Sequence, residues 1–282
     1  MTGTTHHIAD FGAYALPLAR ERIRLRADRY TDTQLGRWRI SLARKQAIRG
    51  LAEPFDVTVA PGVRARLYPS GNRCEKRALA GVQIWDAEER GALQQAVSAG
   101  TGEFVFLDIG ANAGLYSLFV NAYARAADRT VRLIAVEPSA EMAARLSVNA
   151  AASDADIELV RSAISDVPGE ACLSDGGGNR GEASLGESGE TVPVETLTGL
   201  CARLGVDRID AMKLDIEGHD EQALRAFFTD APEALHPHRL ILELSAESRN
   251  ALVELAHAQN YVLQDDTAMN AVFKKKTDHV QT

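Results

Sequence analysis

The residues best suited to chemistry in this 282-residue chain are acidic side chains that follow short apolar runs. The first such run, residues 104–107, leads into Asp108 and then into the turn Gly110-Ala-Asn112-Ala-Gly114. An unbroken apolar run of this length suits a strand that is buried on both faces. A helical pattern begins at Gly114, so a carboxylate, a tight turn and a helix N-terminus meet at one point. Open α/β sheets bind ligands there, outside the carboxyl ends of their strands.

The spacing of this turn argues against a dinucleotide. The dinucleotide pattern is G-x-G-x-x-G, whereas here Asn112 replaces its second glycine and Leu115 its third. Asparagine tolerates the left-handed backbone that a glycine would supply. Asp108 would repel a pyrophosphate, but it would attract a cationic ligand. S-adenosylmethionine has the matching sign, because it carries a sulfonium and an ammonium.

A second acidic residue, Glu137, follows the apolar run of residues 131–136. A carboxylate at the tip of the second strand can accept hydrogen bonds from both hydroxyls of a ribose. Its distance along the chain from Asp108 fits one intervening strand–helix unit. Taken singly, such a residue is often only a helix cap, so the prediction rests on the combination.

A third cluster of chemical groups lies in Lys213-Leu-Asp215-Ile-Glu217-Gly-His219, with Glu243 at the tip of the next expected strand. If this cofactor donates a methyl group to an alcohol, a positioned base adds about 10²–10⁴-fold to the rate. His219 is the favoured base, since an ordinary imidazole titrates near neutral pH. Its alternative role is that of a surface residue at a helix start. Asp215 and Glu243 are the other catalytic candidates.

The same carboxylates leave a metal site open as an alternative. Asp215, Glu217 and Glu243 could converge as oxygen ligands for Mg²⁺ or Ca²⁺, and the ion would lower the pKa of a bound hydroxyl. This reading is not favoured, because the three carboxylates could simply pair with Lys213 or with arginines.

The elements that must position these residues alternate between strand and helix patterns over residues 101–276. Alternating units of this kind predict an α/β fold with a doubly wound, mostly parallel, Rossmann-like sheet. Residues 261–263 and 271–273 are too close together for a crossover helix, so they predict an antiparallel terminal hairpin. A sheet closed in this way is typical of class I methyltransferases. The expected strands cover residues 104–107, 131–136, 157–164, 209–216 and 240–244, and the expected helices residues 114–127 and 139–152.

Residues 1–100 form a separate N-terminal extension in this interpretation. Leu35, Trp38 and Leu42 have helical spacing, residues 57–59 and 63–68 predict a β-hairpin around a Pro-Gly turn, and residues 86–98 predict a helix before a boundary near Gly100. Residues 20–49 hold ten basic and three acidic side chains, a net charge of +7. This segment is a solvated helix surface, a patch for an anionic partner or a homo-oligomer contact. The extension could also cap the acceptor.

The remaining composition limits the function classes. A net charge of −8 disfavours nucleic-acid binding, and no apolar run is long enough to span a bilayer. The N-terminus lacks the apolar region of a secretory signal. Three scattered cysteines favour a reducing, cytoplasmic setting. The glycine-rich residues 174–190 predict a flexible loop, which is either a tolerated insertion or a mobile cover for the substrate.

These motifs together resemble the FkbM-type S-adenosylmethionine-dependent methyltransferases over roughly residues 55–275. The resemblance rests on FLDIGANAGLYS at 106–117, VEP at 136–138, AISD at 163–166 and KLDIEGH at 213–219. It implies a cofactor site made by the following residues. Asp108, Gly110, Asn112 and Gly114 would hold the methionine part, Glu137 the ribose, and the segment with Ala163, Ile164 and Asp166 the adenine, while Tyr116 and Asp215 would lie near the cofactor.

The expected function is therefore transfer of a methyl group from S-adenosylmethionine to a hydroxyl of a sugar or another polyhydroxylated or secondary metabolite. The resemblance permits several small-molecule or glycan acceptors. An NAD-dependent oxidoreductase and a non-catalytic binding module on the same fold are the alternatives. The missing dinucleotide pattern disfavours the first, and the presence of Asp108, Glu137 and Asp215 disfavours the second.

Overall fold

The computed structural model describes residues 9–174, 184–186, 189–216 and 218–276. The chain forms two compact units, Met1–Trp85 and Asp86–Thr282. The helix expected before the boundary, α4 (Ala87–Ser98), packs against α5 (Leu115–Ala126) and belongs to the second unit. No helix among the described residues is both long and apolar enough to cross a bilayer.

The second unit is built on a seven-stranded sheet with the order β12-β13-β11-β10-β3-β4-β5. The central strands run parallel, while β13 is antiparallel to both β11 and β12. The expected mostly parallel sheet with a closing antiparallel hairpin is therefore confirmed. In spatial order the strands are Tyr261–Asp266 (β12), Asn270–Lys275 (β13), Arg239–Glu243 (β11), Ala211–Leu214 (β10), Phe104–Ile109 (β3), Val131–Val136 (β4) and Ile157–Val160 (β5).

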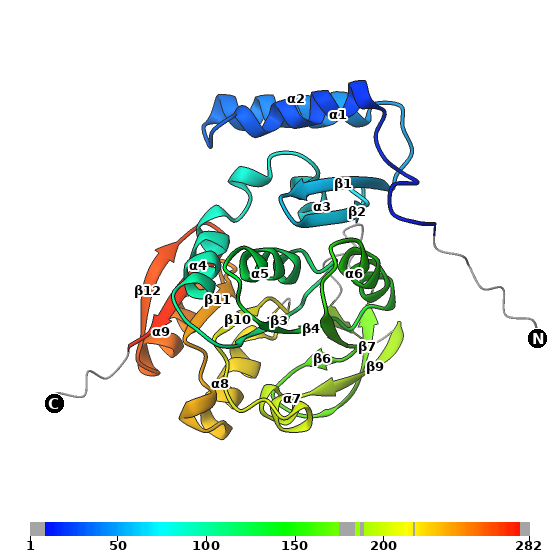
Figure 1. The fold of residues 1–282 in the computed structure, drawn as a ribbon. Helices are drawn as coiled ribbons and strands as arrows, with labels where there is room; N and C mark the ends of the chain where they lie inside the picture. The colour runs from blue at the N-terminus through cyan, green and yellow to red at the C-terminus, as the bar shows by residue number, and fades with distance from the viewer. Residues whose placement is uncertain (1–8, 175–183, 187–188, 217, 277–282) are drawn as a thin grey trace, which may run out of the picture. The chain divides into compact units, whose positions relative to one another are not determined.

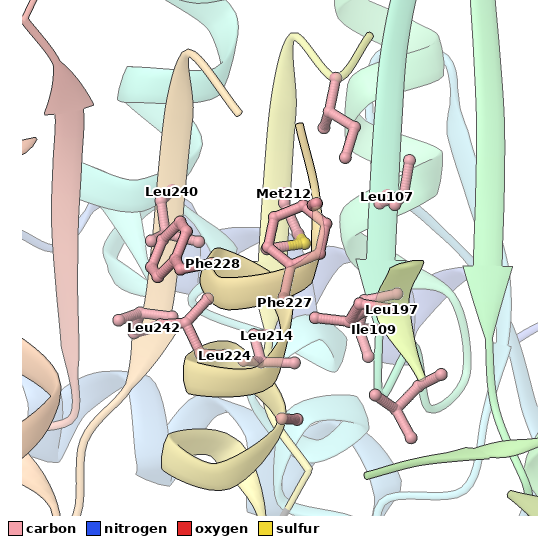
Figure 2. Packing of buried hydrophobic residues seen from close by; sticks show 14 of the residues in the cluster. Leu107, Ile109, Leu197, Met212, Leu214, Leu224, Phe227, Phe228, Leu240 and Leu242 are labelled. Atoms are coloured by element: carbon pink, nitrogen blue, oxygen red, sulfur yellow. The ribbon is translucent and has the colours of Figure 1, made fainter. Parts of the chain in front are cut away.

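Helices cover both faces of this sheet, which explains why every residue of β3 is buried. Figure 1 shows α4, α5 and α6 (Ala140–Ala152) over one face, and α7 (Leu197–Leu204) and α8 (Asp220–Asp230) over the other. Phe227 and Phe228 of α8 lie over β10 and β11 (Figure 2). The core on that side also includes α9 (Arg249–Ala258), which follows the short turn Glu233–Leu235 (η3) and β11.

The prediction of one strand over residues 157–164 is wrong. The segment forms two strands, β5 and the two-residue β6 (Ala163–Ile164), and β6 leaves the main sheet and pairs with β9 (Glu190–Glu195). The polar pair Arg161-Ser162 separates the two pieces. A four-stranded sheet results, with the order β6-β9-β7-β8.

The expected loop over residues 174–190 is also corrected in part. Ser184–Gly186 forms β8, which pairs antiparallel with β7 (Gly169–Ser174). Residues 175–183 and 187–188, which belong to the segment expected to be either a tolerated insertion or a mobile cover, lie outside the described residues.

The described part of the first unit contains three α-helices and a β-hairpin at the position where the sequence predicts one. β1 (Phe55–Ala60) and β2 (Val63–Leu67) pair antiparallel around the Pro-Gly turn. The first two helices are α1 (Leu18–Leu25), continued by η1 (Arg26–Arg29), and α2 (Gln34–Ile48), which Thr33 caps by accepting a hydrogen bond from the Gly36 N–H. α3 (Arg73–Leu79) and η2 (Val82–Ile84) complete the unit.

The pattern Leu35-Trp38-Leu42 predicts α2 correctly but marks its exposed side. These three residues are exposed, whereas the buried side carries Gly36, Ile40, Ala43 and Ala47. Small residues line the buried side because the neighbouring backbone lies close to it: a Cβ built at Gly36 would overlap the carbonyl oxygen of Thr31.

Candidate active site

The turn between β3 and α5 has the backbone that its sequence predicts. Gly110, Asn112 and Gly114 have φ angles of 76°, 53° and 82°, all in the left-handed region. A Cβ built at Gly110 would overlap the carbonyl oxygen of Asp215, and one at Gly114 would lie 2.7 Å from Cγ of Leu146. Glycine is therefore required at both positions, and the end of β10 lies directly against this turn.

Asp108 is buried at the end of β3 and is fixed by Ser117 on α5. Its Oδ2 accepts hydrogen bonds from the Ser117 N–H at 3.1 Å and from the Ser117 hydroxyl at 2.7 Å. Its Oδ1 is buried and has no hydrogen-bond partner among the described residues. Burial raises the pKa of Asp108, and the nearby Lys213 ammonium opposes this rise. An orphaned carboxylate oxygen at this point is suited to a donor from a ligand.

Glu137, at the end of β4, bridges two turns with its carboxylate. One oxygen accepts from the Asn112 N–H at 2.8 Å and the other from the Ser139 N–H at 2.9 Å. Burial raises the pKa of Glu137 to about 7, although these two N–H groups act to lower it. Each carboxylate oxygen can accept a second hydrogen bond, so a diol could be held by both.

The register of the central strands brings Lys213, Asp215 and Glu243 together. Leu214 of β10 pairs with Leu242 of β11, so Asp215 and Glu243 follow side by side. Lys213 is buried, and its Nζ donates to Oδ2 of Asp215 at 2.7 Å. Burial acts to lower the pKa of Lys213, but the carboxylates of Asp215 and Asp108 raise it above its usual range.

Asp215 is held in its charged form. Burial acts to raise its pKa, but the Lys213 ammonium and a hydrogen bond with Glu243 bring the pKa below its ordinary value. Its side chain is 25% exposed. Asp215 therefore combines a fixed negative charge with access from outside.

Tyr116 connects this cluster to α4. The Lys213 Nζ lies 5.1 Å from the centre of the Tyr116 ring, a cation–π distance. The Tyr116 hydroxyl donates to Oδ2 of Asp86 at 2.9 Å. Tyr116 therefore lies against the Asp108–Lys213–Asp215 group, the side of the site where it was expected.

His219 stands at the start of α8, as its sequence predicts, after Gly218 with a φ of 92°. Its Nδ1 is buried without a hydrogen-bond partner among the described residues. Asp220 fixes the preceding turn, because its carboxylate accepts from the N–H groups of Ile216 and Gly218. His219 therefore lies four residues after Asp215, on a turn whose backbone N–H groups are held by the Asp220 carboxylate.

The segment expected near adenine lies beyond Glu137. The Glu137 N–H donates to the Val160 carbonyl, and Arg161 donates to the Pro138 carbonyl. Ala163 and Ile164 are buried in β6, whereas Asp166 is exposed and accepts a hydrogen bond from the Ser165 hydroxyl. The adenine contacts of these residues remain a prediction.

The described residues contain no group of three acidic, histidine or cysteine side chains that could hold a metal ion. Glu217, one of the three carboxylates considered as metal ligands, lies outside the described residues. The other two, Asp215 and Glu243, hydrogen-bond to each other, and Asp215 also accepts from Lys213.

Three residues that shape the site did not stand out in the sequence: Ser117, Asp86 and Asp220. Ser117 and Asp220 lie in the first turn of a helix that follows a motif, where a polar side chain can reach back to the preceding strand or loop. That position is a usable signal. Asp86 gave none, because it meets Tyr116 only through the tertiary fold.

The site as a whole offers a buried anion at Asp108, a diol acceptor at Glu137 and a more open anion at Asp215. This set fits a ligand with a cationic centre and a ribose. S-adenosylmethionine has both. The turn at Gly110, against which the Asp215 backbone packs, lies between the carboxylates of Asp108 and Asp215.

Comparison with known families gives a match to the methyltransferase FkbM domain over residues 108–264, which is more than half of the chain. The match includes Asp108, Glu137, Asp215, His219 and Glu243. A comparison with curated proteins gave no match.

Solved structures with a similar fold include several methyltransferases. The S-adenosylmethionine-dependent methyltransferase from Agrobacterium tumefaciens has 13% identity and a TM-score of 0.47, covering 81% of this chain and 72% of its own. The precorrin-6y C5,15-methyltransferase from Geobacter metallireducens has 12% identity and a TM-score of 0.44, covering 69% and 90%. TrmK from M. capricolum, in complex with S-adenosylhomocysteine, has 10% identity and a TM-score of 0.37, covering 67% and 71%.

Proposed function

Because the chain belongs to the FkbM family of S-adenosylmethionine-dependent methyltransferases, we propose that it methylates a hydroxyl group of a sugar or another polyhydroxylated metabolite. The observation that carries this proposal is the position of Asp215. Its backbone carbonyl oxygen would overlap a Cβ at Gly110, so the end of β10 lies against the expected cofactor turn. The Asp215 carboxylate is charged and partly exposed, and it acts electrostatically on Asp108 at the start of that turn.

The cofactor would be held by residues at three strand ends. Asp108, Gly110, Asn112 and Gly114 would hold the methionine part, and Glu137 would accept from the ribose hydroxyls. The segment from Ser162 to Asp166 would lie along the adenine. S-adenosylmethionine supplies a methyl group already activated by its sulfonium. The protein then has to align the acceptor and exclude water, and such positioning is worth about 7–11 kcal/mol.

The acceptor hydroxyl would be oriented by Asp215 and Glu243. Two adjacent carboxyl groups can hydrogen-bond only when they share a proton, which leaves acceptor capacity toward ligand hydroxyls. His219, with a buried Nδ1 that has no partner among the described residues, would take the proton from the hydroxyl. A hydroxylated acceptor suits these groups better than a phosphorylated one, because Asp215 is charged.

A nucleic-acid acceptor is disfavoured by the net charge of −8 and by the acidic groups at the site. We also place the enzyme in a reducing, cytoplasmic compartment. In support, Cys74, Cys172 and Cys201 are not joined to one another by disulfide bonds.

The first test is thermal unfolding with S-adenosylmethionine, S-adenosylhomocysteine and NAD in parallel. A ligand at ~100 times its dissociation constant adds about 2.7 kcal/mol of stability. We expect both sulfur ligands to raise the unfolding midpoint by several degrees and NAD to leave it unchanged. A shift with NAD alone would instead favour an oxidoreductase.

The second test separates the acceptor classes. S-adenosylhomocysteine formation is measured with a panel of sugars and polyols and with amine analogues of the same compounds, using the wild type and Asp215→Asn. We expect turnover with hydroxyl acceptors that Asp215→Asn abolishes while cofactor binding persists. Turnover confined to amines would overturn the hydroxyl assignment, and cofactor binding without any turnover would favour a non-catalytic module.

A further inference from the structure

One surface of the first unit combines exposed large apolar side chains with basic ones. Leu18 and Trp38 are 68% and 60% exposed, values that exclude them from the core. We call this surface the α1–α2 outer face. Its apolar members are Leu18, Leu25, Leu35, Trp38 and Leu42, and its basic members are Arg22, Arg26, Lys45 and Arg49, all of them exposed.

Helix geometry places these residues on one side. In α1 the spacing of 18, 22 and 25 is i, i+4, i+7, and in α2 residues 35, 38, 42 and 45 form a stripe of the same kind, with Arg49 directly after the end of the helix. The opposite stripe of α2, with Ile40 and Ala43, packs with Ala27 and Ala80 in the core of the unit. The outer face is therefore the side turned away from that core.

The two helices form one continuous surface. They lie side by side in Figure 1, and Arg20 of α1 donates to the carbonyl oxygens of Gln46 and Arg49 at the end of α2. These hydrogen bonds and the packing of α1 against α2 hold the apolar residues of the two helices next to each other.

The charge of the surrounding segment is strongly positive. Residues 20–49 carry ten basic and three acidic side chains. Two of the acidic ones are already paired, Glu21 with Arg24 and Asp32 with Arg37. Few acidic side chains of this segment therefore neutralise the basic residues of the outer face. A partner that matches their charge would have a negatively charged surface.

We propose that the α1–α2 outer face docks this protein on an anionic lipid bilayer. Helices with leucine and tryptophan on one side and arginine or lysine beside them lie in the membrane interface. Tryptophan is favoured at that depth. Basic side chains there gain about fivefold in affinity for each charge near an anionic bilayer.

Two other occupants fit less well. A second copy of this chain would place the same positive surface against itself, since a two-fold interface is made of identical patches. A nucleic acid would neutralise the arginines, but it offers no apolar environment for four leucines.

The test uses the full chain with vesicles of phosphatidylcholine alone and of phosphatidylcholine with phosphatidylglycerol. We expect flotation with the anionic vesicles only, weakened by salt. The chain has two tryptophans, exposed Trp38 and buried Trp85. Vesicle binding should shift the tryptophan emission to the blue, and Trp38→Phe should abolish the shift while leaving flotation nearly intact.

Matched variants separate this face from general surface effects. The triple variant Arg22→Gln, Lys45→Gln, Arg49→Gln should bind anionic vesicles about 10²-fold more weakly. Its control is Arg125→Gln, Arg203→Gln, Arg225→Gln, three exposed arginines of the second unit. The apolar double variant Leu35→Gln, Trp38→Gln should lose about tenfold or more, whereas Val167→Gln, Val262→Gln should lose little.

Circular dichroism and the unfolding midpoint check that each variant is folded, and no arm depends on turnover or cofactor binding. Failure here would therefore leave the methyltransferase proposal unaffected. Absence of flotation, equal flotation with neutral vesicles, or equal losses in the control variants would overturn the proposal. A Trp38-dependent dimer in sedimentation, or an emission shift with RNA and not with vesicles, would also overturn it and identify the true occupant.

Discussion

Glu137 and Asp215 both follow a buried parallel strand, but the side chains around them differ: Asp215 lies beside the Lys213 ammonium and the Glu243 carboxyl. Glu137 accepts hydrogen bonds from two backbone N–H groups, and burial raises its pKa to about 7. Asp215 has Lys213 at 2.7 Å, and its pKa lies below the ordinary value despite burial. The first carboxyl is poised to gain charge when a ligand donates to it, whereas the second is charged in advance.

This difference matches the proposed division of the site. A carboxylate whose remaining hydrogen bonds are donated by ribose hydroxyls needs no permanent positive charge beside it. A carboxylate that must orient a neutral acceptor hydroxyl benefits from being ionised before the acceptor arrives. The comparison therefore predicts that changes on the Lys213 side affect stability and turnover, and that changes on the Glu137 side affect cofactor binding and pH dependence.

The largest effect is expected from Lys213→Met, which removes the counterion itself. Asp108 and Asp215 would then be left without their shared cation. Breaking one side of a buried pair typically costs about 3–5 kcal/mol. Urea denaturation should show a loss of this size, and turnover should disappear.

The control for this variant is Arg225→Met, which breaks an exposed i, i+4 pair with Glu221. An exposed helical pair contributes only about 0.3–0.5 kcal/mol. If both variants lost the same small amount, Lys213 would not be the group that distinguishes the two carboxylates.

The next effect concerns Glu137→Gln. The pKa of Glu137 is about 7 in the folded state and ordinarily 4.5, so the folded protein binds this proton more tightly than the unfolded chain does. Proton binding therefore contributes its full share to the free energy of unfolding below the ordinary pKa of 4.5. This contribution is lost as the pH rises through about 7. Each pKa unit corresponds to about 1.4 kcal/mol, so the ligand-free wild type should lose roughly 3 kcal/mol over this range.

Glu137→Gln cannot titrate, so its stability relative to the wild type should increase between about pH 5 and pH 8. Its affinity for S-adenosylhomocysteine should fall, because the amide accepts fewer hydrogen bonds. Urea denaturation at both pH values and calorimetric binding measure the two effects. Glu254→Gln, at an exposed position on α9, is the matched control. A parallel pH dependence in wild type and Glu137→Gln would show that burial at Glu137 has no electrostatic cost.

The main features of both carboxylate sites could be predicted from the sequence, because they follow from local rules. The apolar run before Asp108 predicts a strand, and the left-handed conformation of Asn112 follows from its place among glycines. The helix start at His219 follows from Gly218. Each of these inferences uses residues close together in the chain.

The features that could not be predicted depend on contacts between distant segments. The pairing of Tyr116 with Asp86 joins two helices, and the break between β5 and β6 depends on a second sheet that pairs with β9. The exposed side of α2 was also hidden, because Leu35, Trp38 and Leu42 have the spacing of a core stripe while glycine and alanine occupy the buried side. Periodicity identifies a helix, but it does not identify which side a small-residue stripe will bury.

A smaller effect on the acceptor side is expected from His219→Gln. If His219 takes the proton from the acceptor hydroxyl, kcat should fall about 10²-fold, which corresponds to about 2.7 kcal/mol. Cofactor affinity should be unchanged, since the change lies on the Asp215 side of the comparison. The pH profile of kcat should lose the limb that the base contributes in the wild type. His238→Gln, at an exposed position, controls for loss of an imidazole, and an unchanged pH profile in His219→Gln would transfer the role of base to Asp215 or Glu243.

The smallest effect tests whether Asp108 belongs with Glu137 or with Asp215. Asp108 is buried like Glu137 but shares the Lys213 cation with Asp215. Ser117→Ala removes the 2.7 Å hydroxyl donor to Asp108 and leaves the N–H donor in place. Loss of one hydrogen bond to a charged group costs about 1.5–3 kcal/mol. The remaining N–H donor and the Lys213 ammonium should keep the loss of stability at about 1.5 kcal/mol, measured by urea denaturation.

Ser147→Ala, which removes a hydroxyl bonded to a backbone carbonyl on α6, is the control. A loss in Ser117→Ala that grows with pH would place Asp108 with Glu137, as a carboxyl awaiting a ligand, whereas a constant loss would place it with Asp215, as an anion stabilised by Lys213.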